Sequence, residues 1–180
     1  MRTFLAIDFG TSQTSVTILP EDSTLPPQII ELNDGQRAVK AIDTAVQLDE
    51  DGKIAYFGAK AHEKANEAPE RTFQNFKVAI GSKDAYQRET EQTKYAPEDL
   101  ALLFLSHLRE IIEEKHFNGV KLSEMEGLSC IIGCPSEWTE VQKNALKDIA
   151  LKSGFPGIKL CDEPVGAIYY NYFFGGLKLK

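Results

Sequence analysis

Two apolar segments that lie far apart in the sequence each run into a carboxylate at a turn. The first, Phe4–Ile7, is followed at once by Asp8 and a short polar stretch. The second lies near the end of the chain, where Leu128–Ile132 and Ile158–Cys161 are apolar and the latter closes on Asp-Glu-Pro with Glu163 at its centre. Acidic residues at the ends of buried strands are what a metal–nucleotide site needs. This pairing predicts such a site in a fold built on a sheet.

The pattern of apolar residues predicts a mixed α/β fold. Strands are expected at Phe4–Asp8, Thr14–Leu19, Gln28–Leu32, Ala45–Leu48, Ile54–Phe57, Leu128–Ile132 and Ile158–Cys161. Helices are expected at Ala59–Ala68, Pro97–His116, Glu137–Lys152 with Ser136 as its cap, and Val165–Phe174. The first two strands form a hairpin, and so do the fourth and fifth. Short helices that follow buried strands imply crossover connections and therefore a mixed sheet flanked by helices.

Size and charge exclude several classes of protein. The chain of 180 residues is long enough for one domain, or for a core with an inserted piece. Its net charge of -7 argues against a general nucleic-acid partner or an anionic membrane surface, because both require a basic face. No apolar run approaches the length of a membrane span. The first residues lack the pattern of a signal peptide.

The cysteines indicate a reducing compartment. There are three, Cys130, Cys134 and Cys161, all among apolar neighbours and without a Cys-x-x-Cys pair. An odd count in this setting is not typical of a disulfide framework or a zinc site. We therefore expect reduced core thiols in a cytoplasmic protein.

The turn of the first hairpin has the composition of an anion-binding nest. Backbone N–H groups of Gly10, Thr11 and Ser12 can point in one direction and bind a phosphate, and glycine allows close approach because it has no Cβ. Asp8 at the end of the strand would be neutralised by a hydrated Mg²⁺ that bridges to phosphates. The alternative is a plain hairpin in which Asp8 caps the turn.

Two further charged residues are candidates for chemistry. Glu163 could orient a water molecule for attack on a γ-phosphate, or it could be an ordinary acidic residue in the first turn of a helix. Lys77 is embedded in an apolar segment and could present its ammonium to a transferring phosphoryl group, or it could simply extend along the surface to water. No Gly-x-x-x-x-Gly-Lys-Ser/Thr segment is present, which excludes a P-loop enzyme.

These motifs, in this order, resemble the actin-like ATPase superfamily and most closely the 70-kDa heat-shock chaperones. The segments that carry the resemblance are Ala6–Ser12, Phe76–Gly81, Tyr95–Glu98, Ile131–Ser136 with the helix after it, and Leu160–Ala167. The resemblance implies a ribonuclease H-like lobe with an inserted α+β subdomain. Its core would comprise residues 1–36 and 117–180, and the insertion residues 37–116.

The resemblance also implies roles for individual residues. Asp8 would hold Mg²⁺ through water, and the loop Gly10–Gln13, with Thr11 and Ser12 at its centre, would bind the phosphates of ATP or ADP. Lys77 and Glu163 would assist hydrolysis. Pro135 would be the switch that reports the bound nucleotide to a substrate domain. The implied partners are an unfolded peptide client and J-domain and nucleotide-exchange co-chaperones.

The resemblance covers only the first lobe of such an ATPase domain. A second lobe and any peptide-binding domain would lie in further sequence, so we expect the 180-residue chain alone to be inactive. Three alternatives remain: an actin-like filament-forming or cell-shape ATPase, a sugar or acetate-type kinase on the same fold, and a binding module that has lost the chemistry. The joint presence of Asp8, Lys77 and Glu163 speaks against the last of these.

Overall fold

The computed structural model describes residues 3–20, 27–34, 37–82 and 95–163. The helix expected at Val165–Phe174 lies outside these residues. The strands are β1 Thr3–Phe9, β2 Gln13–Pro20, β3 Gln28–Ile29, β4 Leu32–Asn33, β5 Ala38–Val39, β6 Ala41–Asp43, β7 Ala45–Leu48, β8 Ile54–Phe57, β9 Thr72–Gln74, β10 Leu128–Cys134 and β11 Lys159–Asp162. The helices are α1 Ala59–Glu63, α2 Pro97–His116 and α3 Glu140–Lys152, with short 3₁₀ segments η1 Pro69–Arg71, η2 Phe76–Ala79 and η3 Leu122–Glu124.

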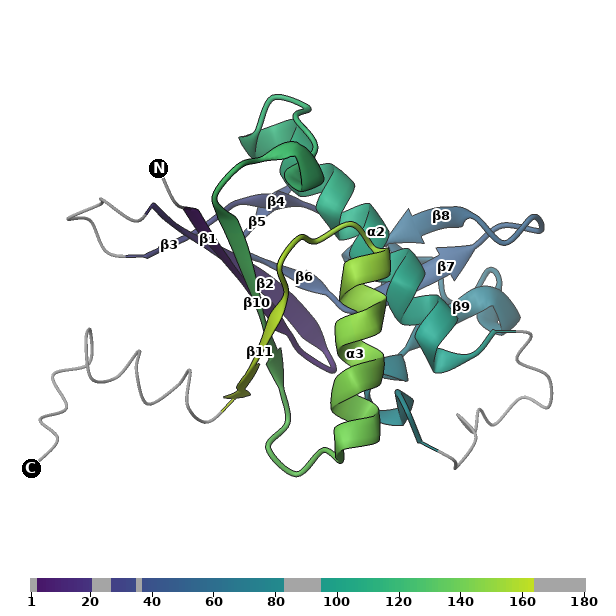
Figure 1. Ribbon diagram of the computed structural model, residues 1–180. Helices are drawn as coiled ribbons and strands as arrows, with labels where there is room; N and C mark the ends of the chain where they lie inside the picture. Colours follow the sequence, from purple (N-terminus) through teal and green to yellow (C-terminus); the bar gives the residue numbers. More distant parts are fainter. Residues whose placement is uncertain (1–2, 21–26, 35–36, 83–94, 164–180) are drawn as a thin grey trace, which may run out of the picture.

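A mixed sheet forms the centre of the molecule (Figure 1). Its strand order is β11-β10-β1-β2-β3, and β6 pairs with the other end of β2. β1 and β2 are the predicted antiparallel hairpin, whereas β1, β10 and β11 run parallel. The expected mixed sheet is therefore confirmed.

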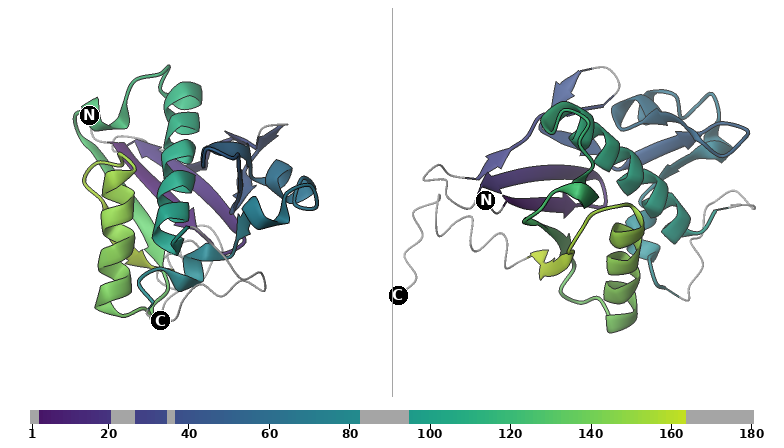
Figure 2. Two further views of the ribbon diagram at one scale, coloured as in Figure 1. Left: turned by 90° about the vertical axis from the view of Figure 1, so that its right-hand side faces the viewer. Right: turned by 45° about the horizontal axis from the view of Figure 1, so that its top comes forward.

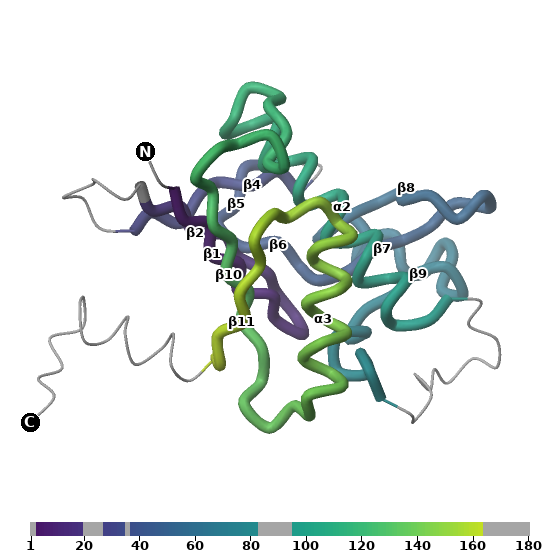
Figure 3. Tube along the Cα trace, in the orientation of Figure 1, coloured from purple at the N-terminus to yellow at the C-terminus, as the bar shows by residue number. Residues whose placement is uncertain are grey.

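The parallel strands are joined through a helix. Figure 3 shows the chain leaving β10, turning through the segment 135–139 and returning along α3 before it enters β11. This is the β-α-β connection expected from the alternation of buried strands and an amphipathic helix. It brings the carboxyl ends of β1, β10 and β11 to the same edge of the sheet.

Helices α2 and α3 lie side by side over one face of the main sheet (Figure 2). Alternate residues of β1 and β10 are buried on this face, as the period of a strand requires. The ring of Phe104 in α2 packs against aromatic rings from both the main sheet and the smaller region beside it. Its centroid is 5.8 Å from Phe9 in β1, 4.8 Å from Phe57 in β8 and 6.1 Å from Phe76 in η2. One helix thus packs against both the central sheet and the elements beside it.

The region 37–116 is built around a smaller antiparallel sheet of order β8-β7-β9. Two of its elements nevertheless lie with the main sheet, because β6 pairs with β2 and α2 packs with α3. The division into a core of 1–36 plus 117–180 and an insertion of 37–116 stays a prediction.

Three expected elements were wrong in detail. The strand Gln28–Leu32 is two strands, because Ile30 donates its N–H to Val16 in the main sheet and the next residues turn away to pair with β5. The helix expected at Ala59–Ala68 ends at Glu63, and the chain continues as turns. Ala61 is the one buried residue of α1, so little packing supports a longer helix.

The cap of α3 is Thr139, three residues after the predicted Ser136. The side-chain hydroxyl of Thr139 accepts the N–H of Gln142, and the side chain of Gln142 accepts the N–H of Thr139. This reciprocal pair is a capping box, which satisfies more of the free N–H groups than a lone serine can.

Two of the cysteines are core residues, as expected. Cys130 and Cys134 are buried in β10, and Cys161 in β11 is partly buried. Burial raises the pKa of Cys130 to about 12, which keeps this thiol protonated and unreactive. No helix within the described ranges is long and apolar enough to cross a membrane.

Glu113 of α2 is a buried carboxylate that ties three segments together. Its side chain is 3% exposed and contacts Arg109 and Lys121, and it accepts the N–H of Leu122 at 2.8 Å. Arg109 in turn donates to the carbonyl of Ser153 at the end of α3.

Glu113→Ala is expected to destabilise the chain by about 3 kcal/mol, because it leaves Arg109 without its buried partner. Urea unfolding followed by circular dichroism measures this. The matched control is Glu114→Ala, which removes an exposed carboxylate from the same helix and should change stability by less than about 0.5 kcal/mol. Equal effects of the two substitutions would contradict the assigned role.

Candidate active site

A cleft of about 510 Å³ opens at the carboxyl ends of the parallel strands. Ile7 of β1 pairs with Ile132 of β10, and Cys134 of β10 pairs with Asp162 of β11, so the residues that follow these pairs meet at one edge. Ligands of open α/β sheets bind at this edge. The cleft is lined by Asp8, Gly10, Thr11, Lys77, Val78, Pro135, Glu137, Trp138, Gln142 and Glu163.

The turn between β1 and β2 is tight and well supported. Gly10 donates its N–H to the carbonyl of Gln13 at 3.0 Å, and a Cβ at Gly10 would lie only 2.3 Å from that oxygen. The hydroxyl of Thr44 donates to the carbonyl of Gly10 at 2.9 Å, and the N–H of Thr44 donates to Ser12 at 2.8 Å. Glycine is therefore required at residue 10, and the turn is held from outside the cleft.

The structure places only half of the predicted phosphate loop against the cleft. Gly10 and Thr11 line it, and Ser12 and Gln13 are not among its lining residues. The amide of Gln13 instead donates to Asp43 Oδ1 at 3.0 Å, which pins β2 to β6. The side-chain amide of Gln13 could bind a phosphate only after its hydrogen bond to Asp43 is broken.

Lys77 and Glu163 form an ion pair at the floor of the cleft. Lys77 Nζ lies 2.5 Å from Glu163 Oε1, although the two residues are 86 positions apart in sequence. The side chain of Lys77 is 2% exposed and that of Glu163 is 40% exposed. The lysine is therefore buried and paired, and the alternative of a lysine that extends along the surface is wrong.

The segment that carries Lys77 is fixed at its end by two helices. Gly81, four residues on, donates its N–H to Glu98 in the first turn of α2 at 2.7 Å. Gly81 has φ of +64°, and a Cβ there would lie 2.8 Å from the Cα of Gln142 in α3. The close approach of the backbones explains why glycine occupies this position and how η2 is held against the cleft.

The electrostatics of Asp8 are those of a site that favours a cation. The carboxyl of Asp8 is exposed to the cleft, but the protein atoms around it displace part of its water and raise its pKa. The negative charge of Glu163 raises this pKa further, and the positive charge of Lys77 lowers it. An ionised Asp8 is thus opposed by its surroundings. A bound cation would favour the ionised form.

Asp8→Asn is expected to raise the melting temperature of the 180-residue chain at pH 7 by a small amount, because water screens much of the charge of this exposed carboxyl. Folding favours the protonated carboxyl of Asp8, so its ionised form lowers stability at neutral pH, and this cost vanishes below the ordinary pKa of 3.8. The difference between variant and wild type should therefore shrink as the pH falls to 4.

Thermal unfolding followed by circular dichroism at pH 7 and pH 4 measures the difference in melting temperature between Asp8→Asn and wild type. Asp51→Asn, which changes an exposed carboxylate, is the control. A variant less stable than wild type at pH 7 would contradict the prediction.

Pro135 and Trp138 come from the segment between β10 and α3. Trp138 donates its N–H to the carbonyl of Pro135 at 3.2 Å, so the two residues belong to one turn. The ammonium of Lys77 lies 5.8 Å from the centroid of the Trp138 ring and 5.7 Å from that of Phe9. Sequence reasoning missed Trp138. The available signal was that the chain's single tryptophan follows the predicted switch Pro135 by three residues.

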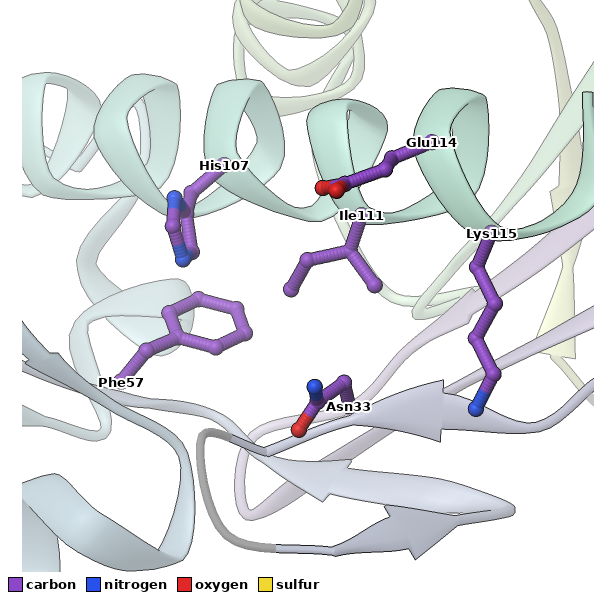
Figure 4. Close-up of a pocket in the computed structure, with 6 residues that line it drawn as sticks. All are labelled: Asn33, Phe57, His107, Ile111, Glu114 and Lys115. Atoms are coloured by element: carbon purple, nitrogen blue, oxygen red, sulfur yellow. The ribbon is translucent and has the colours of Figure 1, made fainter. Parts of the chain in front are cut away.

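A second cavity, of about 370 Å³, lies on the other side of α2 between this helix and strands β4 and β8 (Figure 4). Its floor is formed by Phe57 and Ile111, and His107 stands edge-on to Phe57 at 4.7 Å between ring centroids. Burial lowers the pKa of His107. None of Asp8, Lys77 and Glu163 lines this cavity, and a further hollow of about 550 Å³ is lined by Asp8 and Glu163 without Lys77. The first cleft is lined by all three residues and is therefore the candidate for chemistry.

Comparison with known proteins agrees with the resemblance noted in the sequence. No protein-family model matches the chain. The chain is 23% identical to the chaperone protein DnaK of Thermosipho melanesiensis over 163 residues, which are 91% of this chain and 25% of that protein. It is 24% identical to DnaK of Thermosipho africanus and 23% identical to DnaK of Thermotoga petrophila over the same shares.

The chain thus spans about a quarter of the length of the curated relatives it matches. At this level of identity, the similarities support a distant relationship to the 70-kDa heat-shock chaperones.

Proposed function

We propose that this chain forms the first lobe of an ATP-binding and ATP-hydrolysing domain of a heat-shock-70-like chaperone, with the ribonuclease H-like fold of the actin-like ATPases. The observation that carries the proposal is the Lys77–Glu163 pair, which shares one cleft with Asp8 and the Gly10 turn. The relatives in the two Thermosipho species and in Thermotoga petrophila, each named a chaperone, support it.

In this proposal each group at the cleft has one task. The N–H of Thr11 donates to the terminal phosphates at a turn that Thr44 holds rigid, and Gly10, whose own N–H is bonded to Gln13, lets them approach closely because it has no Cβ. The ammonium of Lys77 stabilises negative charge that develops on the transferred phosphoryl group. Glu163, which is more exposed than Lys77, orients the attacking water.

The residues present fit a hydrated Mg²⁺ better than a fully protein-ligated ion. The described residues contain no group of three His, Cys, Asp or Glu side chains that could hold a metal. Asp8 is nonetheless a carboxylate whose ionised form is opposed by its surroundings. Mg²⁺ typically keeps several waters and binds one or two carboxylates together with phosphates, whose charge it neutralises. Asp8 would hold it through water.

Pro135 would act as the switch, since its turn connects β10 to α3 at the edge of the cleft. The client of the full-length protein would be an unfolded peptide, and J-domain and nucleotide-exchange proteins would be its co-chaperones. These partners rest on the resemblance and on the name of the relatives.

The test compares the full-length protein that contains this chain with the 180-residue chain alone. We expect the full-length protein to bind and hydrolyse ATP, with turnover accelerated by a model unfolded peptide. The chain alone should show no measurable turnover. Turnover by the chain alone would overturn the assignment of this chain as an inactive lobe. A full-length protein that neither binds nor hydrolyses ATP would overturn the proposal as a whole.

A further inference from the structure

We propose that Trp138 is a positioning residue for Lys77: its indole ring holds the lysine ammonium against Glu163. The position of Nζ is a property of the free chain, and only the consequence for hydrolysis rests on the proposed function. The starting observation is that Lys77 is 2% exposed, while Glu163, its hydrogen-bonding partner within the part of the chain that the structure describes, is 40% exposed.

A buried ammonium needs more than one partner, because it has three N–H donors and has lost its water. Hydrogen bonding to Glu163 Oε1 at 2.5 Å supplies one contact. The faces of two aromatic rings, Phe9 at 5.7 Å and Trp138 at 5.8 Å, supply favourable negative potential within cation–π range. Trp138 is the stronger of the two, since indole binds cations better than a phenyl ring does.

The two rings differ in how they are held. Phe9 is 0% exposed, belongs to β1 and packs on Phe104, so its place is set by the core. Trp138 is only partly buried and stands on the turn that begins at Pro135, directly before the cap Thr139. Of the two rings beside Lys77, we therefore expect the indole of Trp138 to move more easily than the ring of Phe9.

This placement links Pro135, the predicted switch, to the ammonium of Lys77 through Trp138. The N–H of Trp138 is bonded to the carbonyl of Pro135 at 3.2 Å, so a change in the turn moves the indole. A displaced indole would remove one of the two aromatic contacts that Lys77 makes with the described residues. The ammonium would then be free to take other positions in the cleft.

The first experiment uses the 180-residue chain without nucleotide. Aromatic ring currents should shift the NMR signals of the Lys77 Hε protons upfield, assigned by their loss in Lys77→Met. Trp138→Leu should remove much of this shift, and Trp138→Phe should retain part of it. Val141→Ala, a nearby exposed apolar residue, is the control and should leave it unchanged. Circular dichroism checks that each variant is folded.

The second experiment uses the full-length protein. Trp138→Leu should lower kcat roughly 10-fold with little change in KM for ATP, and Trp138→Phe should restore most of the rate. An unchanged Lys77 shift in folded Trp138→Leu would overturn the proposal. A lost shift with undiminished kcat would confirm that Trp138 positions Lys77 and would overturn the consequence for hydrolysis. If the wild type hydrolyses nothing, the proposed function fails, while the NMR comparison still decides whether Trp138 positions Lys77.

Discussion

Lys77→Met and Glu163→Gln are each expected to lower ATP hydrolysis by the full-length protein about 100-fold or more. In the proposed function, Lys77 would supply a positive charge from a buried position, where it would act on the phosphoryl group more strongly than in water. Glutamine at position 163 keeps the size of glutamate but loses the charge that pairs with Lys77 and that, in the proposed function, would orient a water molecule. The two effects should appear in kcat, because neither residue is assigned to nucleotide binding.

Single-turnover hydrolysis together with nucleotide binding separates these quantities. We expect KM and the affinity for ADP to change by only a few-fold. The matched controls are Lys60→Met and Glu63→Gln, which remove the same charges from a surface pair on α1 with Nζ and Oε2 3.2 Å apart. They should leave kcat unchanged. A double variant of Lys77 and Glu163 should lose little more than each single one, because the two residues act as a unit. Near wild-type kcat in either single variant would refute these roles.

Much of the sheet could be predicted because its strands are locally encoded. β1 is an apolar run that ends at Asp8, β2 follows it across a glycine-containing turn, and β10 buries every second residue. α2 was predicted from Pro97 to His116 and has those bounds, because apolar residues recur at helical spacing behind a proline at the first position. In these elements local preference and burial favour the same structure.

The short strands could not be predicted because tertiary pairing decides them. β5 and β6 have two and three residues and exist only through β4 and β2, to which they pair. The split of Gln28–Leu32 has the same origin, since nothing in these residues marks where the chain leaves one sheet for another. At the start of α3, Ser136 and Thr139 are both good caps, and only Thr139 has a glutamine three residues on.

The candidate site shows the same division. Asp8 and Glu163 stand out in the sequence as carboxylates at strand ends, but their meeting depends on the order β11-β10-β1. Lys77 is 86 residues from Glu163 and lies on a 3₁₀ segment without periodicity, so its partner was not predictable from spacing. Trp138 carries no charge, and its position three residues after Pro135 is its one signal in the sequence. Its relation to Lys77 appears only when η2 and the turn before α3 are packed together.

The same ion pair predicts an asymmetry in stability, because only one of its two partners is buried. Glu163→Ala should destabilise the 180-residue chain by about 3 kcal/mol, because it leaves a 2% exposed ammonium without its hydrogen-bonding partner. Lys77→Met should be neutral or stabilising by about 1 kcal/mol. It replaces a buried charge by an apolar side chain of similar length, and the 40% exposed Glu163 can turn to water.

The decisive variant combines the two changes. Adding Lys77→Met to Glu163→Ala should recover most of the lost stability, since no buried charge then remains unpaired. Urea unfolding of the wild type, the two single variants and the double variant measures these differences in stability. As controls, Lys60→Met and Glu63→Ala on the surface should each change stability by less than about 0.5 kcal/mol. Equal losses in the two single variants, or no recovery in the double variant, would show that the buried lysine carries no such cost. Recovery together with lost hydrolysis would mean that Lys77 is retained for chemistry, at the expense of a more stable fold.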